Sequence, residues 1–296
     1  MRIFMTGATG YIGQGLVPIL VEAGHEIVAL SRSPEKDNAL VKLGAEPVRG
    51  TLAAPDSYRA EAAQAEGIIH AAFDYASNGA KQDRTAIETL IAAGKEGGAQ
   101  CFVFTSGVWV LGECPDGADE HHVITKPLPR VAWREEHEKL VLAARTADFA
   151  TAVLRSGLVY GGKSSLLNPL FESSEKEGKA AYVGDGKNRW PLVYREDLAH
   201  LYRLIVESQA DGVFHGVDGS SLAVSEVARL ANQAVGGKGD SRSIPLEVAK
   251  KEKGDWVEAL TLDQVVIAPR SRELGWQPSI ASFAQGSTPA YSEWKA

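Results

Sequence analysis

The chain begins Met1-Arg-Ile-Phe-Met-Thr-Gly-Ala-Thr-Gly-Tyr-Ile-Gly13, and this stretch decides the fold. An apolar run leads into glycines at positions 7, 10 and 13, and apolar residues then recur at helical spacing from Leu16 to Val21. The pattern predicts a strand, a tight turn and a helix. Such a turn lets the backbone approach a phosphate, whose charge is met by free N–H groups and the helix dipole. Because the spacing is Gly-x-x-Gly-x-x-Gly and not the commoner Gly-x-Gly-x-x-Gly, the prediction of a dinucleotide site needs support from the rest of the chain.

Composition narrows the class of protein. The 296 residues are 44% hydrophobic and carry a formal net charge of −7, which favours a small-molecule partner over nucleic acid, because phosphate backbones select basic surfaces. Two cysteines make no disulfide framework. The start lacks a leader pattern, and no apolar run approaches the roughly 18 residues that a membrane span needs. We therefore expect a cytoplasmic protein without a membrane partner, either a monomer or a homodimer.

Strand and helix patterns alternate after the first turn. Further strands are expected at residues 26–30, 47–49, 67–73, 100–107 and 150–155, with helices at 56–65, 83–96 and 129–145. This order predicts an α/β fold, a Rossmann-type doubly wound parallel sheet. Ligands of such sheets bind at the carboxyl ends of the strands. The candidate cofactor-binding residues are therefore Gly7, Thr9, Gly10, Tyr11, Ile12, Gly13, Ser31, Arg32, Ser33, Thr51, Leu52, Ala71, Ala72, Phe73 and Thr105.

The tip of the second strand bears on cofactor choice. An acidic side chain there would accept the ribose hydroxyls of NAD and repel a 2′-phosphate, whereas arginine and hydroxyl groups would bind that phosphate. Here Arg32 lies between Ser31 and Ser33 without an acid. The sequence favours NADP over NAD.

Later motifs extend this pattern. They are Ile68-Ile-His-Ala-Ala72, Val103-Phe-Thr-Ser-Gly107, Leu154-Arg-Ser-Gly-Leu-Val-Tyr-Gly161, and Gly184-Asp-Gly-Lys-Asn-Arg-Trp-Pro191 followed by Asp197. With the opening turn, the chain resembles the extended short-chain dehydrogenase/reductase superfamily, in its atypical branch that is like the NAD-dependent epimerases and dehydratases. The resemblance implies a dinucleotide-binding Rossmann domain at residues 1–161 plus 192–218. It also implies a small, mainly C-terminal substrate-binding subdomain at residues 162–191 plus 219–296.

That superfamily normally uses a Tyr-x-x-x-Lys pair on the helix after the fifth strand, with a Ser or Thr at the strand end. By resemblance, Ser106 would polarise the substrate oxygen, but the Tyr and Lys positions fall on Arg130 and Arg134. Arg134 could hold the nicotinamide ribose, although it cannot titrate near neutral pH. Tyr160, after the sixth strand, is the substitute proton donor that we consider. The Tyr291-x-x-x-Lys295 sequence lies too far along the chain to take that role.

Several side chains near the strand ends are candidates for a substrate pocket. Aromatic and apolar residues there could enclose an apolar or ring-shaped substrate, or simply pack in the core; they are Tyr75, Val108, Trp109, Trp133 and Trp190. The loop with Cys114 and residues 119–122 lacks the paired ligand spacing of a zinc site, so we expect no metal.

These observations predict an NADP(H)-dependent oxidoreductase acting on a small organic or sugar-like carbonyl or alcohol. Loss of the Tyr and Lys leaves two alternatives open. One is a sensor or scaffold that binds NADP without catalysis, and the other is an epimerase, isomerase or lyase on the same fold. Fold analogy does not identify the substrate.

Overall fold

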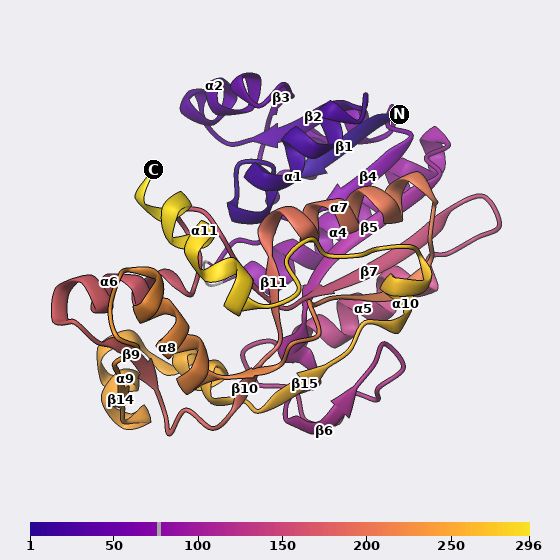
Figure 1. Cartoon of the computed structure of the whole chain (residues 1–296). Coiled ribbons are helices and arrows are strands. Elements are labelled where there is room, and N and C mark those ends of the chain that lie inside the picture. Colours follow the sequence, from indigo (N-terminus) through magenta and orange to yellow (C-terminus); the bar gives the residue numbers. More distant parts are fainter. Residues whose placement is uncertain (76–77) are drawn as a thin grey trace.

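The computed structural model describes residues 1–75 and 78–296, and a seven-stranded sheet lies at its centre (Figure 1). The strand order is β12-β7-β5-β4-β1-β2-β3, and every neighbouring pair is parallel. The chain order reverses between β1 and β4, which is the position where doubly wound sheets bind ligands. The strands are β1 (Arg2–Thr6), β2 (Glu26–Ser31), β3 (Glu46–Arg49), β4 (Gly67–His70), β5 (Cys101–Gly107), β7 (Ala150–Ser156) and β12 (Gly212–Gly216).

Alternating side chains along the strands build a hydrophobic core on each face of the sheet. In β1, Ile3 and Met5 enter one core and Phe4 enters the other, as the two-residue period of a strand requires. Helices α1 (Tyr11–Glu22) and α7 (Arg195–Glu207) cover the first face, while α4 (Gly79–Gly97) and α5 (Trp133–Ala143) cover the second. The predicted doubly wound α/β fold is confirmed.

A third cluster of buried side chains lies outside the sheet. It includes Leu170, Phe171, Val227 and Phe283, so segments far apart in sequence share one core, seen beside the sheet in Figure 1. Its elements are α6 (Asn168–Glu177), α8 (Val224–Ala234) and α11 (Phe283–Lys295), with β8 (Leu158–Tyr160) and β11 (Leu192–Tyr194). The domain boundaries expected from the sequence stay a prediction.

The parallel pair β8 and β11 connects the two regions. Val159 and Val193 belong to a sheet core, whereas Tyr160 and Tyr194 belong to the third cluster. The remaining elements are short: α2 (Pro34–Lys42), η1 (Pro55–Ser57), α3 (Arg59–Ala62), η2 (Val108–Leu111), β6 (Cys114–Ala118), β9 (Ala180–Val183), β10 (Arg189–Trp190), β13 (Leu222–Ala223), β14 (Ser241–Ile244), α9 (Leu246–Lys253), η3 (Asp255–Thr261), β15 (Gln264–Val266) and α10 (Pro269–Glu273).

Several sequence-based boundaries differ from the structure; the helix expected from residue 83, for example, begins at Gly79. The helix expected at 56–65 is split into η1 and α3, because Tyr58 between them has the non-helical angles φ −136° and ψ −11°. The fourth strand ends at His70 and not at residue 73, which frees residues 71–73 to lie at the carboxyl edge of the sheet. The helix expected from residue 129 begins at Trp133, after a turn.

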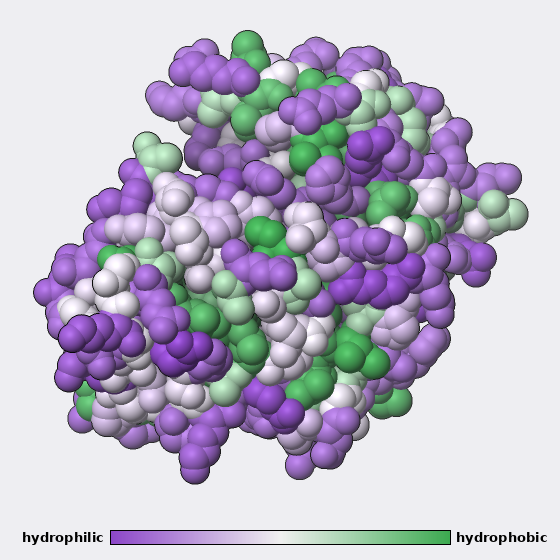
Figure 2. Space-filling view, viewed as in Figure 1, coloured by the Kyte–Doolittle hydropathy of each residue, from purple (hydrophilic) through white to green (hydrophobic). Residues whose placement is uncertain are grey.

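The surface is mainly polar. Figure 2 shows hydrophilic residues over most of one face, with hydrophobic residues in scattered patches. Within residues 1–75 and 78–296, no helix combines the length and hydropathy needed to span a membrane.

Candidate functional site

The glycine turn lies at the switch point between β1 and β4. Gly7 adopts φ +79°, and a Cβ on it would lie 2.5 Å from the carbonyl carbon of Ala71. A Cβ on Gly13 would lie 2.2 Å from the Gly7 carbonyl oxygen. The N-cap residue of helix α1 is Gly10, which provides no side-chain cap, so the N-terminal dipole of the helix is left for a ligand. This geometry fits a phosphate-bearing cofactor, because only glycine allows such close packing under an open helix N-terminus.

Side chains of the turn have structural partners of their own. The Tyr11 hydroxyl donates to the Gly161 carbonyl over 2.6 Å, and burial raises the pKa of this phenol above its ordinary value. The Thr9 carbonyl accepts from the Gln14 amide over 3.0 Å, and Ile12 is half-buried against the sheet core. A cofactor at this turn would therefore meet mainly backbone N–H groups.

At the end of β2, the three predicted residues differ in availability. Ser31 is buried and its hydroxyl donates to the Ser33 carbonyl. The Ser33 hydroxyl caps α2 by accepting from the Lys36 N–H. Arg32 has a side chain that is 68% exposed and lies 3.9 Å from an Asp74 oxygen, an ion pair that water and salt weaken. Arg32 is thus the residue of the three whose side chain extends into solvent.

The remaining candidate on this side is the stretch after β3. Thr51 is exposed, and its N–H donates to the Ser57 hydroxyl over 3.3 Å. Leu52 is only 8% exposed and packs in a sheet core. The side chain of Leu52 therefore contributes to the fold, which leaves only its backbone for a cofactor.

A buried chain of polar side chains lies beneath the loop after β4. The Thr6 hydroxyl lies 2.6 Å from His70 Nδ1, and it also accepts from the Ala72 N–H over 3.3 Å. His70 Nε2 lies 3.2 Å from Asp83, whose other oxygen lies 2.7 Å from His137 Nδ1. Burial alone would raise the pKa of Asp83, but the hydrogen bonds from His137 and His70 outweigh it and lower that pKa below its ordinary value. The network fixes Ala72 and joins β1, β4, α4 and α5 at the carboxyl edge.

The end of β5 does not present Ser106 as predicted. Ser106 is 3% exposed, and its hydroxyl donates to Glu138 on α5 over 2.5 Å. Glu138 also accepts from Arg155, whose Nη2 lies 2.7 Å away. The structure does not support Ser106 as the group that polarises a substrate oxygen, because its single hydroxyl proton is already given to a buried carboxylate.

Arg134 is the cation at this edge. Its Nη1 donates to the Thr105 carbonyl over 3.2 Å, while the Thr105 hydroxyl lies 2.6 Å from that of Tyr202. Burial lowers the pKa of the Arg134 guanidinium, and Asp83 opposes that shift; an arginine stays protonated in proteins. Arg130, at the other predicted position, lies exposed before α5 begins.

Three aromatic rings in mutual contact, which we call the aromatic platform, lie beside Arg134. Phe73 and Trp133 stack with ring centres 4.8 Å apart and an interplanar angle of 10°. Tyr75 meets Phe73 edge-on at 5.0 Å and is 79% exposed. The Arg134 guanidinium lies 4.9 Å from the Trp133 ring centre and 5.7 Å from that of Phe73. The predicted residues Phe73 and Trp133 thus contact the cation, and Tyr75 joins them through Phe73.

The other predicted catalytic and substrate residues are corrected by their burial. Tyr160 is fully buried in the third cluster against Phe283, so the suggestion that it donates a proton to substrate is wrong. Trp190 is 5% exposed and donates to the Leu260 carbonyl, and Val108 is 1% exposed in a sheet core. Neither lines an open pocket. Trp109 is partly buried and packs against the third cluster, beyond the end of β5.

The contacts of Tyr291 and Lys295 agree with the prediction that this Tyr-x-x-x-Lys sequence takes no part in catalysis. Both side chains bind Glu175 on α6: the Tyr291 hydroxyl donates over 2.7 Å, and Lys295 lies 3.0 Å away. Their role is to attach the last helix to α6.

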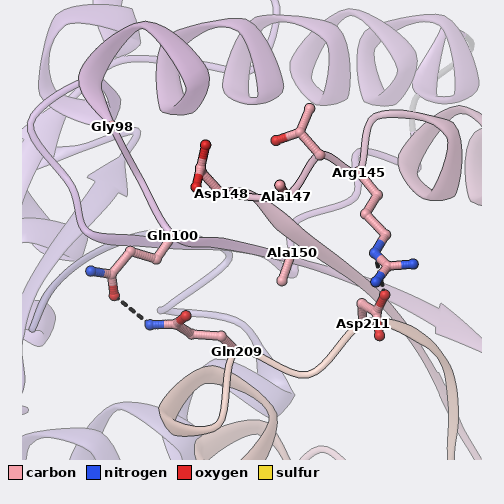
Figure 3. A pocket seen from close by; sticks show the side chains of 9 residues that line it. Gly98, Gln100, Arg145, Ala147, Asp148, Ala150, Gln209 and Asp211 are labelled. Atoms are coloured by element: carbon pink, nitrogen blue, oxygen red, sulfur yellow. Dashed lines mark hydrogen bonds and ion pairs between the residues drawn. The ribbon is translucent and has the colours of Figure 1, made fainter.

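Two cavities lie away from the glycine turn. One of about 480 Å³ lies at the amino ends of β5, β7 and β12, where Arg145 pairs with Asp211 and Gln209 donates to Gln100 over 2.6 Å (Figure 3). Doubly wound sheets bind ligands at the opposite edge, so this cavity is not assigned to the site. A second cavity, of about 330 Å³, is lined by Glu113, Thr125, Lys126, Leu128, Glu258, Thr261 and Leu262. Its lining joins residues 125–128, which precede α5, to residues of η3.

No group of three or more His, Cys, Asp or Glu side chains within the described ranges could hold a metal ion.

Comparison with known proteins agrees with this geometry. The model of the NAD dependent epimerase/dehydratase family matches residues 3–215. An uncharacterised protein of Schizosaccharomyces pombe is 32% identical over 94% of this chain and 95% of its own length. A 2-alkyl-3-oxoalkanoate reductase of Stenotrophomonas maltophilia is 29% identical over 84% of this chain and 80% of that protein. The crystal structure of human epimerase family protein SDR39U1 (isoform 2) with NADPH is similar in fold, with a TM-score of 0.81, 21% identity and coverage of 99% of each chain.

Proposed function

The chain belongs to the NAD-dependent epimerase/dehydratase family of NAD(P)-dependent enzymes, and we propose that it is an NADP(H)-dependent oxidoreductase that interconverts the carbonyl and alcohol forms of a small organic molecule. The observation that carries the proposal is the switch-point turn, where a Cβ on Gly7 would lie 2.5 Å from Ala71 and α1 begins without a side-chain cap. A relative named as an oxoalkanoate reductase supports carbonyl chemistry.

The residues around the turn would each hold one part of the cofactor. The backbone N–H groups at the start of α1 would bind the pyrophosphate, and Arg32 would bind the 2′-phosphate as a charge-assisted hydrogen-bond donor. Ala71 and Ala72, fixed by Thr6 and His70, would line the ribose side. Arg134 would orient the nicotinamide ribose from the end of β5. When bound, the nicotinamide supplies or accepts a hydride.

Cofactor binding tests the proposal directly. Titration of the purified full-length protein, followed by the change in nicotinamide fluorescence, should give a lower Kd for NADPH than for NADH. Arg32→Glu should weaken NADPH by about 10-fold or more, since a hydrogen bond to a charged group is worth about 1.5 to 3 kcal/mol, and should leave NADH little changed. Arg84→Glu makes the same charge change on α4, where Arg84 pairs with Glu88 on the surface, and serves as the control.

Two results would overturn the assignment. Absence of binding by either cofactor up to millimolar concentration would reject the oxidoreductase function. Tighter binding of NADH than NADPH, unaffected by Arg32→Glu, would reject the NADP preference while leaving the family chemistry in place.

A further inference from the structure

We infer that the substrate is a planar conjugated carbonyl compound, of which a quinone is the simplest case, and that Arg134 stabilises the oxyanion that its reduction creates. The inference rests on the proposed NADP(H)-dependent function and adds the class of substrate to it. It follows from three features of the carboxyl edge: a fixed cation with free donors, hydroxyl groups that are engaged elsewhere, and a surface of aromatic rings.

The fixed cation is Arg134. Among the described residues, no carboxylate lies within 4.0 Å of its guanidinium, and its one hydrogen bond is from Nη1 to the Thr105 carbonyl. Its Nε and Nη2 are not among the fully buried unpartnered atoms of the described residues, so neither is completely enclosed. The Asp83 carboxylate, the largest electrostatic influence on Arg134 after burial, has both oxygens bound by histidines. The guanidinium can therefore receive a negative oxygen from a ligand.

The described groups that could protonate an alkoxide beside Arg134 are bound to other residues or, in the case of Tyr75, not held in place. Ser106 donates to Glu138, and the Thr105 hydroxyl is paired with that of Tyr202. His137 is 5% exposed and its Nδ1 is bound to Asp83. The Tyr75 phenol is 79% exposed, and no described residue holds it in place by a hydrogen bond. Among the described residues, no side chain is held in place as a proton donor at this edge, so the inference takes the proton from water.

Because no described side chain is positioned as an acid, this edge favours a substrate whose reduced form is a weak base. Reduction of an ordinary ketone creates an alkoxide about as basic as hydroxide, whose parent water has a pKa of about 15.7. Such a reduction needs a general acid, a role that an arginine, which stays protonated in proteins, does not take. A hydride, carrying two electrons, converts a quinone into a hydroquinone monoanion, while the nicotinamide is oxidised by the same two electrons. That monoanion is a phenolate, whose conjugate acid resembles tyrosine with a pKa of about 10. Arg134 would stabilise it until one proton from water completes the hydroquinone.

The aromatic platform favours the same acceptor. Phe73 and Trp133 stack almost parallel, and the guanidinium lies against both rings. A flat ring placed on these side chains would gain stacking contacts while its oxygen lies toward the cation. A flexible aliphatic ketone would gain neither contact to the same degree.

The first test measures binding without turnover. 2-Naphthol serves as the probe of a phenolate, and its ionisation is followed by ultraviolet absorbance with the full-length protein in excess. The pKa of bound naphthol should fall by about one unit relative to free naphthol, the shift expected for an opposite charge within about 4 to 6 Å. Arg134→Gln should abolish the shift, whereas Arg84→Gln should retain it. An unshifted pKa on the wild-type protein, or a full shift on Arg134→Gln, would overturn the role of Arg134.

The second test measures substrate class. With NADPH, and after subtraction of the rate without protein, kcat/KM for 1,4-naphthoquinone should exceed that for cyclohexanone by about 100-fold or more, the contribution of the general acid that a ketone would need. The kcat/KM for the quinone should not fall between pH 6 and 8. The titratable groups with an electrostatic effect on Arg134 are Asp83 of α4, Tyr202 of α7, Tyr75 and, on α5 itself, Glu138. His137 lies one turn along α5.

The outcomes separate this inference from the proposed function. Comparable turnover of the ketone would overturn the substrate class. So would a quinone rate that falls as pH rises and loses that dependence in Tyr75→Phe or His137→Asn, because a side-chain acid would then be required. Failure of NADPH to bind in the fluorescence titration would instead reject the oxidoreductase function, and the naphthol measurement needs no cofactor.

Discussion

Replacing Arg155 by methionine should cost about 3 to 5 kcal/mol of folding free energy, because the change leaves a buried carboxylate without its cation. Arg155 Nε lies 3.2 and 3.1 Å from the two oxygens of Glu138, and Nη2 lies 2.7 Å from one of them. The two side chains are 6% and 3% exposed, so water cannot screen the remaining charge. After the substitution, the Ser106 hydroxyl is the partner that Glu138 keeps.

A double variant that removes both charges measures the net contribution of the Glu138–Arg155 ion pair to folding. Arg155 Nη1 is buried without a partner, so the ion pair does not recover its full desolvation cost. Glu138→Met with Arg155→Met should therefore regain most of the loss and lie within about 1 to 2 kcal/mol of the wild type. Arg84→Met breaks a pair with Glu88 in which the side chains are 51% and 50% exposed, and should cost only about 0.3 to 0.5 kcal/mol.

Urea unfolding provides the assay, followed by tryptophan fluorescence and far-ultraviolet circular dichroism at neutral pH. The Arg155→Met midpoint should fall while the slope m stays constant, because the surface exposed on unfolding is unchanged. A loss below about 1 kcal/mol, or equal losses in the single and double variants, would refute the reasoning, since either result means that Glu138 and Arg155 are not coupled in a dry environment.

Three further predictions concern single positions. Gly7→Ala should lower stability by at least about 2 kcal/mol and weaken NADPH binding, because Gly7 has φ +79° and its Cβ would meet Ala71 at 2.5 Å; unchanged urea midpoint and NADPH affinity would contradict this. Burial raises the pKa of Asp218 to about 6, so between about pH 4 and 6 the native state holds a proton that the unfolded chain has lost, and stability falls as pH rises. The free energy of unfolding of Asp218→Asn should not show that fall, so between pH 4 and 7 it should rise by roughly 2 to 3 kcal/mol relative to that of the wild type. Parallel pH profiles of the two proteins would disprove this. Tyr160→Phe deletes a buried hydroxyl without a partner, so the free energy of unfolding should stay the same or rise by about 1 kcal/mol. The kcat/KM should stay within about twofold of the wild type, whereas removal of a proton donor would lower it by about 10²-fold.

The sheet was predictable because its information is local. Each strand is a short apolar run, each run is followed by a helix or turn, and the glycines at 7, 10 and 13 mark the first turn. These features set a parallel order without any knowledge of distant contacts. The register of β1 between β2 and β4 then follows from burial on both faces.

The polar contacts at the carboxyl edge were not predictable in the same way. Thr6, His70, Asp83 and His137 come from four separate elements, and nothing near any one of them in sequence indicates the other three. Ser106 matched a family position, but Glu138 approaches it only after α5 packs on β5.

Packing, and not residue type, decides which aromatic candidates lie beside Arg134 and which are buried in a core. Trp133 and Trp190 look equivalent in the sequence, yet Trp133 stacks on Phe73 beside Arg134 while Trp190 is buried in the third cluster. Tyr160 is similarly enclosed, because Phe283 and Gly286 of the last helix pack on its ring. Those partners lie more than a hundred residues later, so a local pattern could not reveal the burial.

The composition of the third cluster has a consequence for synthesis on the ribosome. Strands β1 to β5 are complete by Gly107, but the third cluster needs Phe283 and Ala290 from the final helix. The ribosome adds about 5 to 20 residues per second. Earlier members of that cluster, such as Phe171 and Val227, are therefore made several seconds before the final helix, while the strands of the sheet can already pair. During this interval they leave an apolar surface uncovered, and emergence of α11 from the ribosome is the event that covers it.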